Sequence, residues 1–399
     1  KVCRAGLWAG VLLNLGILFY FKYYDFFFEN VNAVFKTDFT LRHILLPLGI
    51  SFFTFQQLSF IIDRAKGKAE HYSFINYLTF VTFFPQLIAG PIVLYKEMMP
   101  QFEDTANRRF NSDQFAKGII IFTIGLGKKV LLADNLALPV NFGFEQNLFL
   151  DTPSTLLMIL AYTFQIYFDF SGYSDMAIGL GKMFNIELPI NFNSPYKACS
   201  VKELWQRWHM TLSRFFIQYV YIPMGGSRKG KARTIFNTFM VFFLSGLWHG
   251  ANWNYVLWGC YYGALLLIEK LVLKKVLNRL PGIIQRIYTM FFVVIGWIIF
   301  KCEDMAYGIS YLKAMFGGFG QGLWNNETLY LLGNYAVLFV LAILGSTMLP
   351  KKAAGVVLGG RKRTWAENVI YIAFYAVIFF VSVAYLVDAT YNPFLYFRF

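Results

Sequence analysis

The stretch VIYIAFYAVIFFVSVAYLV, residues Val369–Val387, contains no charged side chain. A helix of about 20 apolar residues is long enough to cross the roughly 30 Å hydrocarbon layer of a membrane. Similar runs occur at Ala5–Tyr24, Ile287–Phe300 and Leu329–Met348. These runs predict an all-α polytopic membrane protein, with about ten or more transmembrane and re-entrant helices around a central cavity.

The composition of the whole chain supports this fold class. Of its 399 residues 57% are hydrophobic and only 15% are charged, whereas soluble proteins carry about 25% charged residues. No internal repeat or polar linker divides the sequence, so we expect a single membrane domain over residues 1–399. The sequence begins with Lys1 rather than Met, which is compatible with a preceding segment.

The net charge of +14 is concentrated in short loops between the apolar runs: Arg64–Lys68, Arg228–Arg233, Lys270–Arg279 and Lys351–Arg363. Basic residues accumulate in the cytoplasmic loops of membrane proteins, where they also meet anionic lipid. We therefore expect these loops on the cytoplasmic side and the region Lys301–Glu327 on the outer side. This distribution favours membrane lipid as the partner and argues against nucleic acid.

Several familiar kinds of site are missing from the sequence. The four cysteines, Cys3, Cys199, Cys260 and Cys302, have no CxxC or other metal-ligand spacing. We accordingly predict neither a disulfide nor a metal site. There is no GxSxG elbow, P-loop, dinucleotide glycine motif or HExxH.

The segment LSGLWHGANWN, Leu244–Asn254, places His249 at the tip of an apolar hairpin. Its arms, Ile235–Trp248 and Tyr255–Ile268, have about 14 residues each, or roughly 21 Å of helix. Because this is shorter than the hydrocarbon layer, we expect His249 at membrane depth beside a cavity. Imidazole is well suited to proton transfer near neutral pH, and intramembrane titratable groups are usually functional. The alternative is a histidine that only hydrogen-bonds across helices.

The neighbours of His249 in this hairpin are also candidates. Gly246 and Gly250 would let another backbone or a slim ligand approach closely. Trp248 and Asn252 are predicted substrate-binding residues.

A second histidine, His209, lies in the segment Lys202–Gly226. Aromatic and apolar residues recur there near helical spacing, which predicts an amphipathic helix suited to the membrane interface. Its candidate substrate-binding residues are Trp205, Arg207, Trp208 and Arg214. The segment is either an interfacial anchor or part of the lining of an active site.

The motif FDFSGYSD, Phe168–Asp175, places Asp169 and Asp175 after an apolar run. Carboxylates at membrane depth could pair with basic residues, bind a cation or assist acid–base chemistry, so both acids are expected near the site, with Asp169 as a candidate substrate-binding residue. For Asp169 we favour a structural salt bridge with Arg207 or Arg214.

The motif FFPQLIAGPI, Phe83–Ile92, contains two prolines and a glycine. It predicts a broken or re-entrant segment that lines a cavity, with Gln86 as a polar group there. A simply kinked helix is the alternative.

Together these motifs resemble those of the membrane-bound O-acyltransferases, in the bacterial branch typified by the alginate O-acetylation membrane protein. The resemblance runs from about Gly49 to the C-terminus. It rests on the ordered motifs GISFFTFQQLSFIID (Gly49–Asp63), FFPQLIAGPI, FDFSGYSDMAIGLG, INFNSPY (Ile190–Tyr196), WHMTLSRF, YIPMGG, SGLWHGANWNYVLWG and NPFLYFRF (Asn392–Phe399).

The resemblance implies that His249 is the catalytic base and His209 the second polar residue of the site. It also implies a multi-pass protein of the bacterial inner membrane that passes acetyl groups from cytosolic acetyl-CoA outward. No permanently bound cofactor is implied. A separate extracytoplasmic acetyltransferase or esterase-like protein would then esterify the polysaccharide.

Other functions compete with this one. D-alanyl transfer from a phosphopantetheine carrier protein to teichoic acid is the nearest alternative within the same family. A transporter or channel with a histidine-lined path is an alternative of another class, and a purely structural membrane partner is a third.

Overall fold

A computed structural model describes residues 4–68, 73–88, 90–145, 151–318, 325–350, 352, 364–388 and 394–395. Within these ranges the chain forms helices joined by short loops and contains no strand, which confirms the all-α prediction. Most of Lys351–Arg363 and of Asn392–Phe399 lies outside the described residues.

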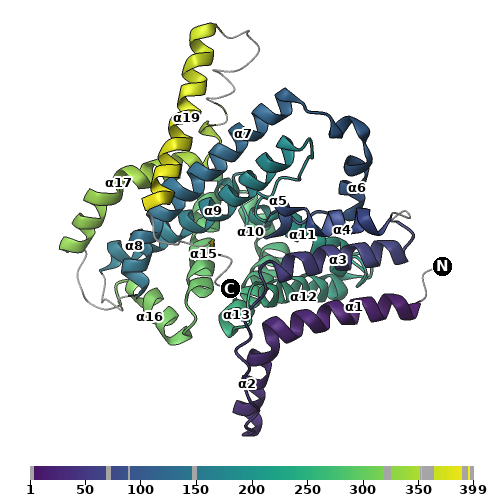
Figure 1. The fold of residues 1–399 in the computed structure, drawn as a ribbon. Coiled ribbons are helices and arrows are strands. Elements are labelled where there is room, and N and C mark those ends of the chain that lie inside the picture. The colour runs from purple at the N-terminus through teal and green to yellow at the C-terminus, as the bar shows by residue number, and fades with distance from the viewer. Residues whose placement is uncertain are drawn as a thin grey trace.

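The first part of the chain runs from one side of the molecule across to the other (Figure 1). Its elements are α1 (Arg4–Leu18), η1 (Phe19–Tyr23), α2 (Tyr24–Phe35), α3 (Ile50–Ala65), α4 (Phe74–Thr82), α5 (Phe84–Leu87), α6 (Tyr95–Glu103), η2 (Thr105–Arg108), α7 (Ser112–Gly127), η3 (Lys128–Ala133) and α8 (Asp134–Glu145).

The second part supplies the central helix, the histidine hairpin and the C-terminal helices. Its elements are α9 (Thr152–Met183), η4 (Pro195–Lys197), α10 (Val201–Trp205), α11 (Met210–Phe216), η5 (Ile217–Tyr221), α12 (Lys231–His249), α13 (Trp253–Ile268), η6 (Glu269–Leu273), α14 (Lys274–Leu277), α15 (Gly282–Lys301), α16 (Met305–Met315), α17 (Asn326–Ser346) and α19 (Trp365–Asp388).

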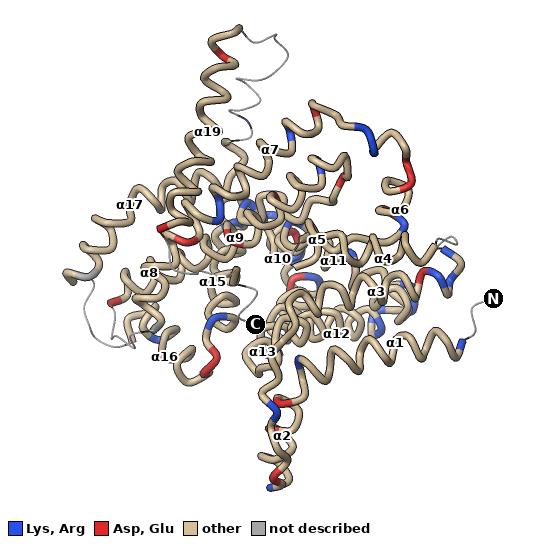
Figure 2. The backbone as a smooth tube through the Cα atoms, viewed as in Figure 1, with Lys and Arg blue, Asp and Glu red and all other residues tan. Residues whose placement is uncertain are grey.

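Five helical stretches in the described part of the chain are long and apolar enough to cross a membrane: Arg4–Phe35, Trp253–Leu277, Gly282–Lys301, Thr328–Ser346 and Trp365–Asp388. They contain the predicted apolar runs Ala5–Tyr24, Ile287–Phe300 and Val369–Val387 and most of the run Leu329–Met348. Charged residues lie mainly near helix ends, and long uncharged stretches run along α1, α13, α17 and α19 (Figure 2). The membrane class is thus confirmed, while ten or more membrane segments around a central cavity stay a prediction.

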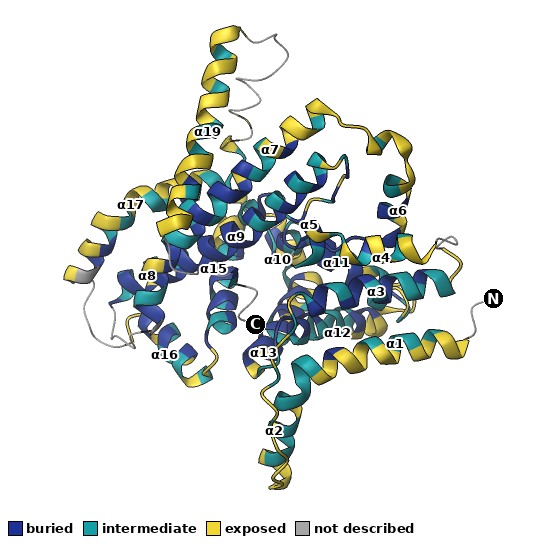
Figure 3. Cartoon of the chain, viewed as in Figure 1, coloured by how far each residue is buried: buried dark blue, intermediate teal, exposed yellow. Residues whose placement is uncertain are grey.

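The centre of the bundle is α9, a helix of 32 residues. It is buried along most of its length, whereas α1, α17 and α19 expose much of their surface (Figure 3). Glycines let α7 and α9 approach closely, because a Cβ atom on Gly125 would lie only 2.5 Å from the carbonyl oxygen of Gly172. The exposed side chains of the outer helices are largely apolar, as expected for contact with lipid.

Candidate active site

His249 ends α12, and the backbone turns away at Gly250 before α13 begins at Trp253. The predicted hairpin is therefore confirmed, but its arms are longer than predicted. Helix α12 has 19 residues, or about 28 Å, and α13 continues through η6 and α14 to give a 25-residue stretch. At about 28 Å, α12 nearly matches the roughly 30 Å hydrocarbon layer, so short arms no longer argue for a tip at membrane depth. His249 is 95% buried because other helices pack around it.

The two glycines near His249 allow α12 and α13 to approach each other closely. A Cβ atom on Gly246 would lie 2.3 Å from the carbonyl oxygen of Tyr255, and one on Gly250 would lie 2.2 Å from the ring of the same tyrosine. Of the two predicted roles for these glycines, the structure supports close approach of a protein segment.

The imidazole of His249 lies among aromatic rings. Its ring centre is 5.1 Å from that of Trp248, 4.9 Å from that of Trp258 and 5.3 Å from that of Phe300. Trp258 comes from α13 and Phe300 from α15, so three helices fix the position of this side chain. An imidazole held in this way is shielded from bulk water.

Lys22 binds the end of α12 that carries His249. Its ammonium group donates hydrogen bonds to the backbone carbonyl oxygens of Trp248 at 2.6 Å and His249 at 3.1 Å, and to Ser51 Oγ at 3.3 Å. The hydroxyl of Tyr23 donates to the carbonyl oxygen of Leu247 at 2.8 Å. The last carbonyls of a helix lack partners within the helix and carry partial negative charge, which explains why a cation lies here.

Both Lys22 and Tyr23 belong to η1, a π-helical turn inside the long N-terminal helix. Such turns are rare and often occur at functional sites. Lys22 is also the lone charged residue within the predicted apolar run Ala5–Tyr24. A charge in an apolar helix is a signal of function, so the sequence carried the information needed to select Lys22.

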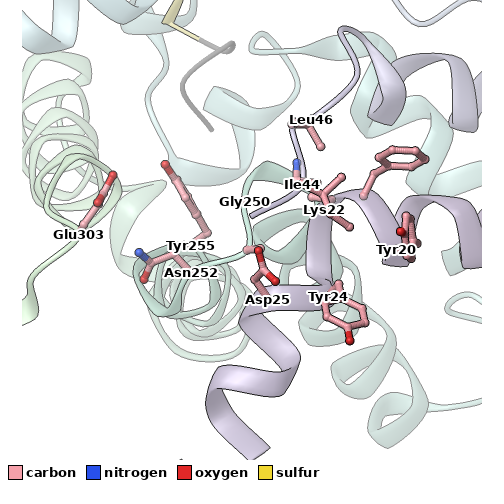
Figure 4. Close-up of a pocket in the computed structure, with 12 residues that line it drawn as sticks. Tyr20, Lys22, Tyr24, Asp25, Ile44, Leu46, Gly250, Asn252, Tyr255 and Glu303 are labelled. Atoms are coloured by element: carbon pink, nitrogen blue, oxygen red, sulfur yellow. The ribbon is translucent and has the colours of Figure 1, made fainter. Parts of the chain in front are cut away.

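Two cavities border this region. The larger, of about 290 Å³, is lined among others by Lys22, Asp25, Asn252, Tyr255 and Glu303 (Figure 4). The smaller, of about 40 Å³, is lined among others by Lys22, Ser51 and His249. Lys22 borders both cavities. The predicted substrate-binding residue Asn252 thus lies on the larger cavity, and His249 on the smaller one.

His209 lies where the chain departs from the predicted continuous helix. Helix α10 ends at Trp205, and His209 adopts a left-handed backbone with φ of 44° just before α11. A non-glycine residue in this conformation costs of the order of 1–3 kcal/mol and persists only where its surroundings impose it. The prediction of one amphipathic helix through Lys202–Gly226 is therefore wrong.

Asn191 holds this turn in place. Its side-chain oxygen lies 3.1 Å from His209 Nδ1 and accepts hydrogen bonds from the Thr211 backbone N–H at 3.3 Å and from the Thr211 hydroxyl at 3.0 Å. The Asn191 backbone carbonyl accepts from the N–H of Met210 at 3.0 Å. Asn191 comes from the motif INFNSPY, but its contact with His209 joins residues from two separate loops and was missed.

The two histidines meet across Trp248. The ring centre of Trp248 is 5.1 Å from that of His249 and 5.7 Å from that of His209. Trp205 packs against Trp258, the neighbour of His249, at 5.3 Å. His209, Trp248 and His249 are thus brought together, as the sequence predicted for residues of one site.

Trp208 lies deeper in the core. It is 2% exposed and packs against Phe192 and Trp297. An anchor at the membrane interface would expose this tryptophan, so its burial contradicts the interfacial alternative for this segment.

The two arginines of the segment form ion pairs. Arg207 contacts Glu203 at 2.8 Å, and Arg214 binds both carboxylate oxygens of Glu97 at 2.7 and 3.0 Å. Burial alone disfavours the charged form of Glu203, but hydrogen bonds from the Cys199 backbone N–H and from Arg207 outweigh it and hold the pKa of this carboxyl below its usual range. Arg207 also donates to the carbonyl oxygen of Asn193, and Arg214 to that of Ile92, so each arginine joins a loop to a helix.

Asp169 forms the structural salt bridge that was predicted, but with a different partner. Its carboxylate lies 2.8 Å from Lys129 Nζ and accepts a hydrogen bond from the Leu395 backbone N–H at 3.0 Å. The expected pairing with Arg207 or Arg214 is therefore wrong. The reason is topological, because η3 runs beside α9 and presents Lys129 to this aspartate.

The segment around Gln86 is broken, as predicted, rather than simply kinked. Helix α4 ends before Phe83, α5 is a short helix, and the buried residues Ile92–Leu94 are not helical. Gln86 is fully buried and donates to the carbonyl oxygen of Phe80 at 3.1 Å. Ile88, two residues later, lines the small cavity beside His249.

Comparison with known proteins agrees with this geometry. Residues 58–309, which include both histidines, match the model of the membrane-bound O-acyltransferase family. The chain is 42% identical over 342 residues to the peptidoglycan O-acetyltransferase of Helicobacter pylori, covering 79% of this chain and 65% of that protein. It is 41% identical over 325 residues to a probable alginate O-acetylase AlgI of Pseudomonas aeruginosa, covering 79% of this chain and 61% of that protein.

A more distant relative is named for a different activity. The chain is 31% identical over 279 residues to the teichoic acid D-alanyltransferase of Bacillus subtilis, covering 65% of this chain and 70% of that protein. The chain spans slightly less than two thirds of the length of the Helicobacter pylori and Pseudomonas aeruginosa relatives. From the match to the family model and the identity to these relatives, the chain belongs to the membrane-bound O-acyltransferase family.

Proposed function

We propose that this protein is a membrane O-acetyltransferase that moves acetyl groups from cytosolic acetyl-CoA toward a polysaccharide of the cell envelope. The observation that carries the proposal is the position of His249, which ends α12, is buried among aromatic rings and borders a small cavity. Relatives at 41–42% identity are named as O-acetylating proteins. The cytoplasmic membrane of a bacterium is the location that this function requires.

His249 acts as the general base in this scheme. Its imidazole takes the proton of an acceptor hydroxyl while the acceptor oxygen forms a bond to the carbonyl carbon of the thioester. The carbon–sulfur bond then breaks, and the coenzyme A thiolate leaves with the proton from the imidazolium. His209 lies across Trp248 from His249 and orients the substrate. The chain needs no nucleophile of its own for such direct transfer.

The basic residues suit a donor that carries phosphates. Lys231 and Arg233 lie in the first turn of α12, at the opposite end of that helix from His249. Lys274 and Lys275 lie at the end of the return arm, in α14. Acetyl-CoA is consumed as a substrate in this scheme, with its phosphates drawn to these residues.

The acetyl acceptor and the protein that carries the acetyl group onward are separate molecules in this scheme. The larger cavity, which Asn252 borders, is the proposed route for an acceptor hydroxyl toward the histidines. A separate extracytoplasmic acetyltransferase or esterase-like protein would carry the acetyl group onward to the polysaccharide. Membrane lipid surrounds the exposed apolar faces of the outer helices.

D-alanyl transfer is the second candidate, because the Bacillus subtilis relative is named as a teichoic acid D-alanyltransferase. That reaction would take its acyl group from the phosphopantetheine of a carrier protein. The lower identity of this relative, 31% against 42%, favours the acetyl donor.

Purified protein in detergent or liposomes tests the proposal directly. Radiolabelled acetyl-CoA and a D-alanyl carrier protein are supplied in parallel, with the extracytoplasmic partner present, and thioester loss and label transfer are followed. We expect acetyl-CoA to be consumed by the wild type and not by His249→Asn. The exposed His43 provides a matched control, since its side chain borders neither of the two cavities near the site.

Each other outcome identifies a different function. Consumption of the carrier-protein thioester alone would establish D-alanyl transfer. Flux of a solute or of protons through the liposomes without consumption of either thioester would favour a transporter. Equal activity of His249→Asn and the wild type would remove His249 from the mechanism.

A further inference from the structure

The small cavity beside His249 has a polar side made by three side chains. Those of Lys22, Ser51 and His249 border it, and the other residues around it are apolar or aromatic. Ser51 is 92% buried, so its hydroxyl has little contact with bulk water. Buried polar groups normally have hydrogen-bond partners, so the partners of the Ser51 hydroxyl show what this group can do.

The contact with Lys22 determines what Ser51 can do. The ammonium group of Lys22 has only donors, so Ser51 Oγ accepts in the 3.3 Å hydrogen bond between them. The proton of the Ser51 hydroxyl is therefore available for another acceptor, and no described side chain or carbonyl accepts it within hydrogen-bond distance. The positive charge on Lys22 makes this hydroxyl a stronger donor.

The start of α3 adds to the same electrostatic environment. Gly49, Ile50, Ser51 and Phe52, which form the first turn of this 16-residue helix, all border the cavity. Gly49 permits this placement, because it has a φ of 74° and a Cβ atom would lie 2.7 Å from the carbonyl oxygen of Leu87. The N–H groups of Ile50 and Phe52 already donate to the carbonyl oxygens of Pro47 and Gly49. The N-terminus of the helix nevertheless carries partial positive charge, which stabilises an anion nearby.

We infer that Ser51, polarised by Lys22, donates a hydrogen bond to the carbonyl oxygen of the acyl group while His249 accepts the proton of the attacking hydroxyl. The inference rests on the proposed acyl transfer. Negative charge develops on the carbonyl oxygen as the new carbon–oxygen bond forms. When the carbon–sulfur bond breaks, that electron pair re-forms the carbonyl double bond and the negative charge leaves on the thiolate. Ser51 keeps its proton throughout, so its hydroxyl stabilises the transition state without changing the overall reaction.

The same helix provides a matched control for this role. Ser59 is also buried on α3, but its hydroxyl donates to the carbonyl oxygen of Gln56 at 2.7 Å and does not border either cavity near His249. Ser51→Ala and Ser59→Ala therefore remove the same group from the same helix. Ser51→Cys keeps the size of the side chain with a weak donor, and Ser51→Thr restores a hydroxyl.

The experiment measures kcat and KM for acyl transfer by the purified full chain with its donor. We expect Ser51→Ala to lower kcat about 100-fold, the scale for loss of one such donor, with little change in KM for the donor. Ser51→Cys should be slow as well, Ser51→Thr should recover much of the rate, and Ser59→Ala should retain it. Size-exclusion profiles in detergent check that each variant is folded.

Three outcomes overturn the inference. A kcat for folded Ser51→Ala close to that of the wild type would do so while leaving the proposed function intact. Equal losses in Ser51→Ala and Ser59→Ala would assign the effect to the packing of α3. If the wild type consumes no thioester with its partner present, the proposed function itself fails, and this role for Ser51 fails with it.

Discussion

The ammonium group of Lys22 lies 3.1 Å from the backbone carbonyl oxygen of His249, although 227 positions separate the two residues in the sequence. The N-terminal helix is thereby tied to the end of the hairpin that carries the candidate base. The contact holds the backbone of His249, and the imidazole is held separately by rings from α13 and α15. Lys22 is therefore a positioning residue for the site.

Replacement of Lys22 by Met should lower both stability and activity. It leaves the carbonyl oxygens of Trp248 and His249 without this donor, and each unsatisfied buried group costs about 1–3 kcal/mol. Thermal unfolding in detergent and the rate of acyl transfer measure the two effects. Tyr23→Phe is the control, because it releases only the carbonyl oxygen of Leu247. A Lys22→Met variant as active as Tyr23→Phe would contradict the positioning role.

Loss of the Asn191 side chain should release His209. Asn191→Ala removes the acceptor shared by His209 and Thr211, and we expect a loss of stability of about 1–3 kcal/mol with a lower kcat. Thr211→Val is the comparison, since it leaves Asn191 beside His209 while removing the Thr211 hydroxyl, which donates to Asn191 and accepts from the Ile92 backbone N–H at 2.9 Å. Activity that falls more in Thr211→Val than in Asn191→Ala would show that His209 does not depend on Asn191.

The elements that could be predicted from the sequence are those set by local pattern. The uncharged run Val369–Val387 lies within α19, and the hairpin around His249 forms as expected. The length of the hairpin was wrong because the apolar pattern stops near Lys231 and Arg233, whereas the helix continues through them. Lysine and arginine are good helix formers, so a change from apolar to basic residues does not end a helix.

The contacts that complete the site depend on which segments meet in space. The sequence offers many cations to Asp169, and only the packing of η3 against α9 selects Lys129. The turn at His209 has a similar origin, since the partner that holds it, Asn191, comes from another loop. Helical spacing around His209 predicted a helix, and these hydrogen bonds favour a turn instead.

The buried pair of Asp169 and Lys129 should matter more for stability than the neighbouring pair. Lys129→Met leaves two carboxylates without their cation, that of Asp169, which is 1% exposed, and that of Asp134, which lies 2.6 Å from Lys129 Nζ. Loss of one partner from a buried ion pair costs about 3–5 kcal/mol. Lys128→Met breaks an ion pair with Asp175 whose side chains are 23% and 30% exposed, so it should cost about 1 kcal/mol or less. Thermal unfolding of the two adjacent lysine variants gives the comparison, and equal losses would contradict it.

Close packing of the hairpin makes Gly246 sensitive to a single methyl group. A Cβ atom there would lie 2.3 Å from the carbonyl oxygen of Tyr255 and 3.1 Å from Gly259, so α12 and α13 must move apart in Gly246→Ala. Such overpacking costs about 1–3 kcal/mol, and it should also slow acyl transfer because His249 lies within one turn of the altered contact.

Gly333 on α17 is the matched control for this substitution. Nothing lies within 4 Å of a Cβ atom built there, so Gly333→Ala should gain about 0.5–1 kcal/mol from the higher helix propensity of alanine. The two variants are therefore expected to shift the unfolding temperature in opposite directions, with activity lost only in Gly246→Ala. A Gly246→Ala protein as stable and as active as Gly333→Ala would show that the hairpin adapts to the added methyl group and that its close packing does not position His249.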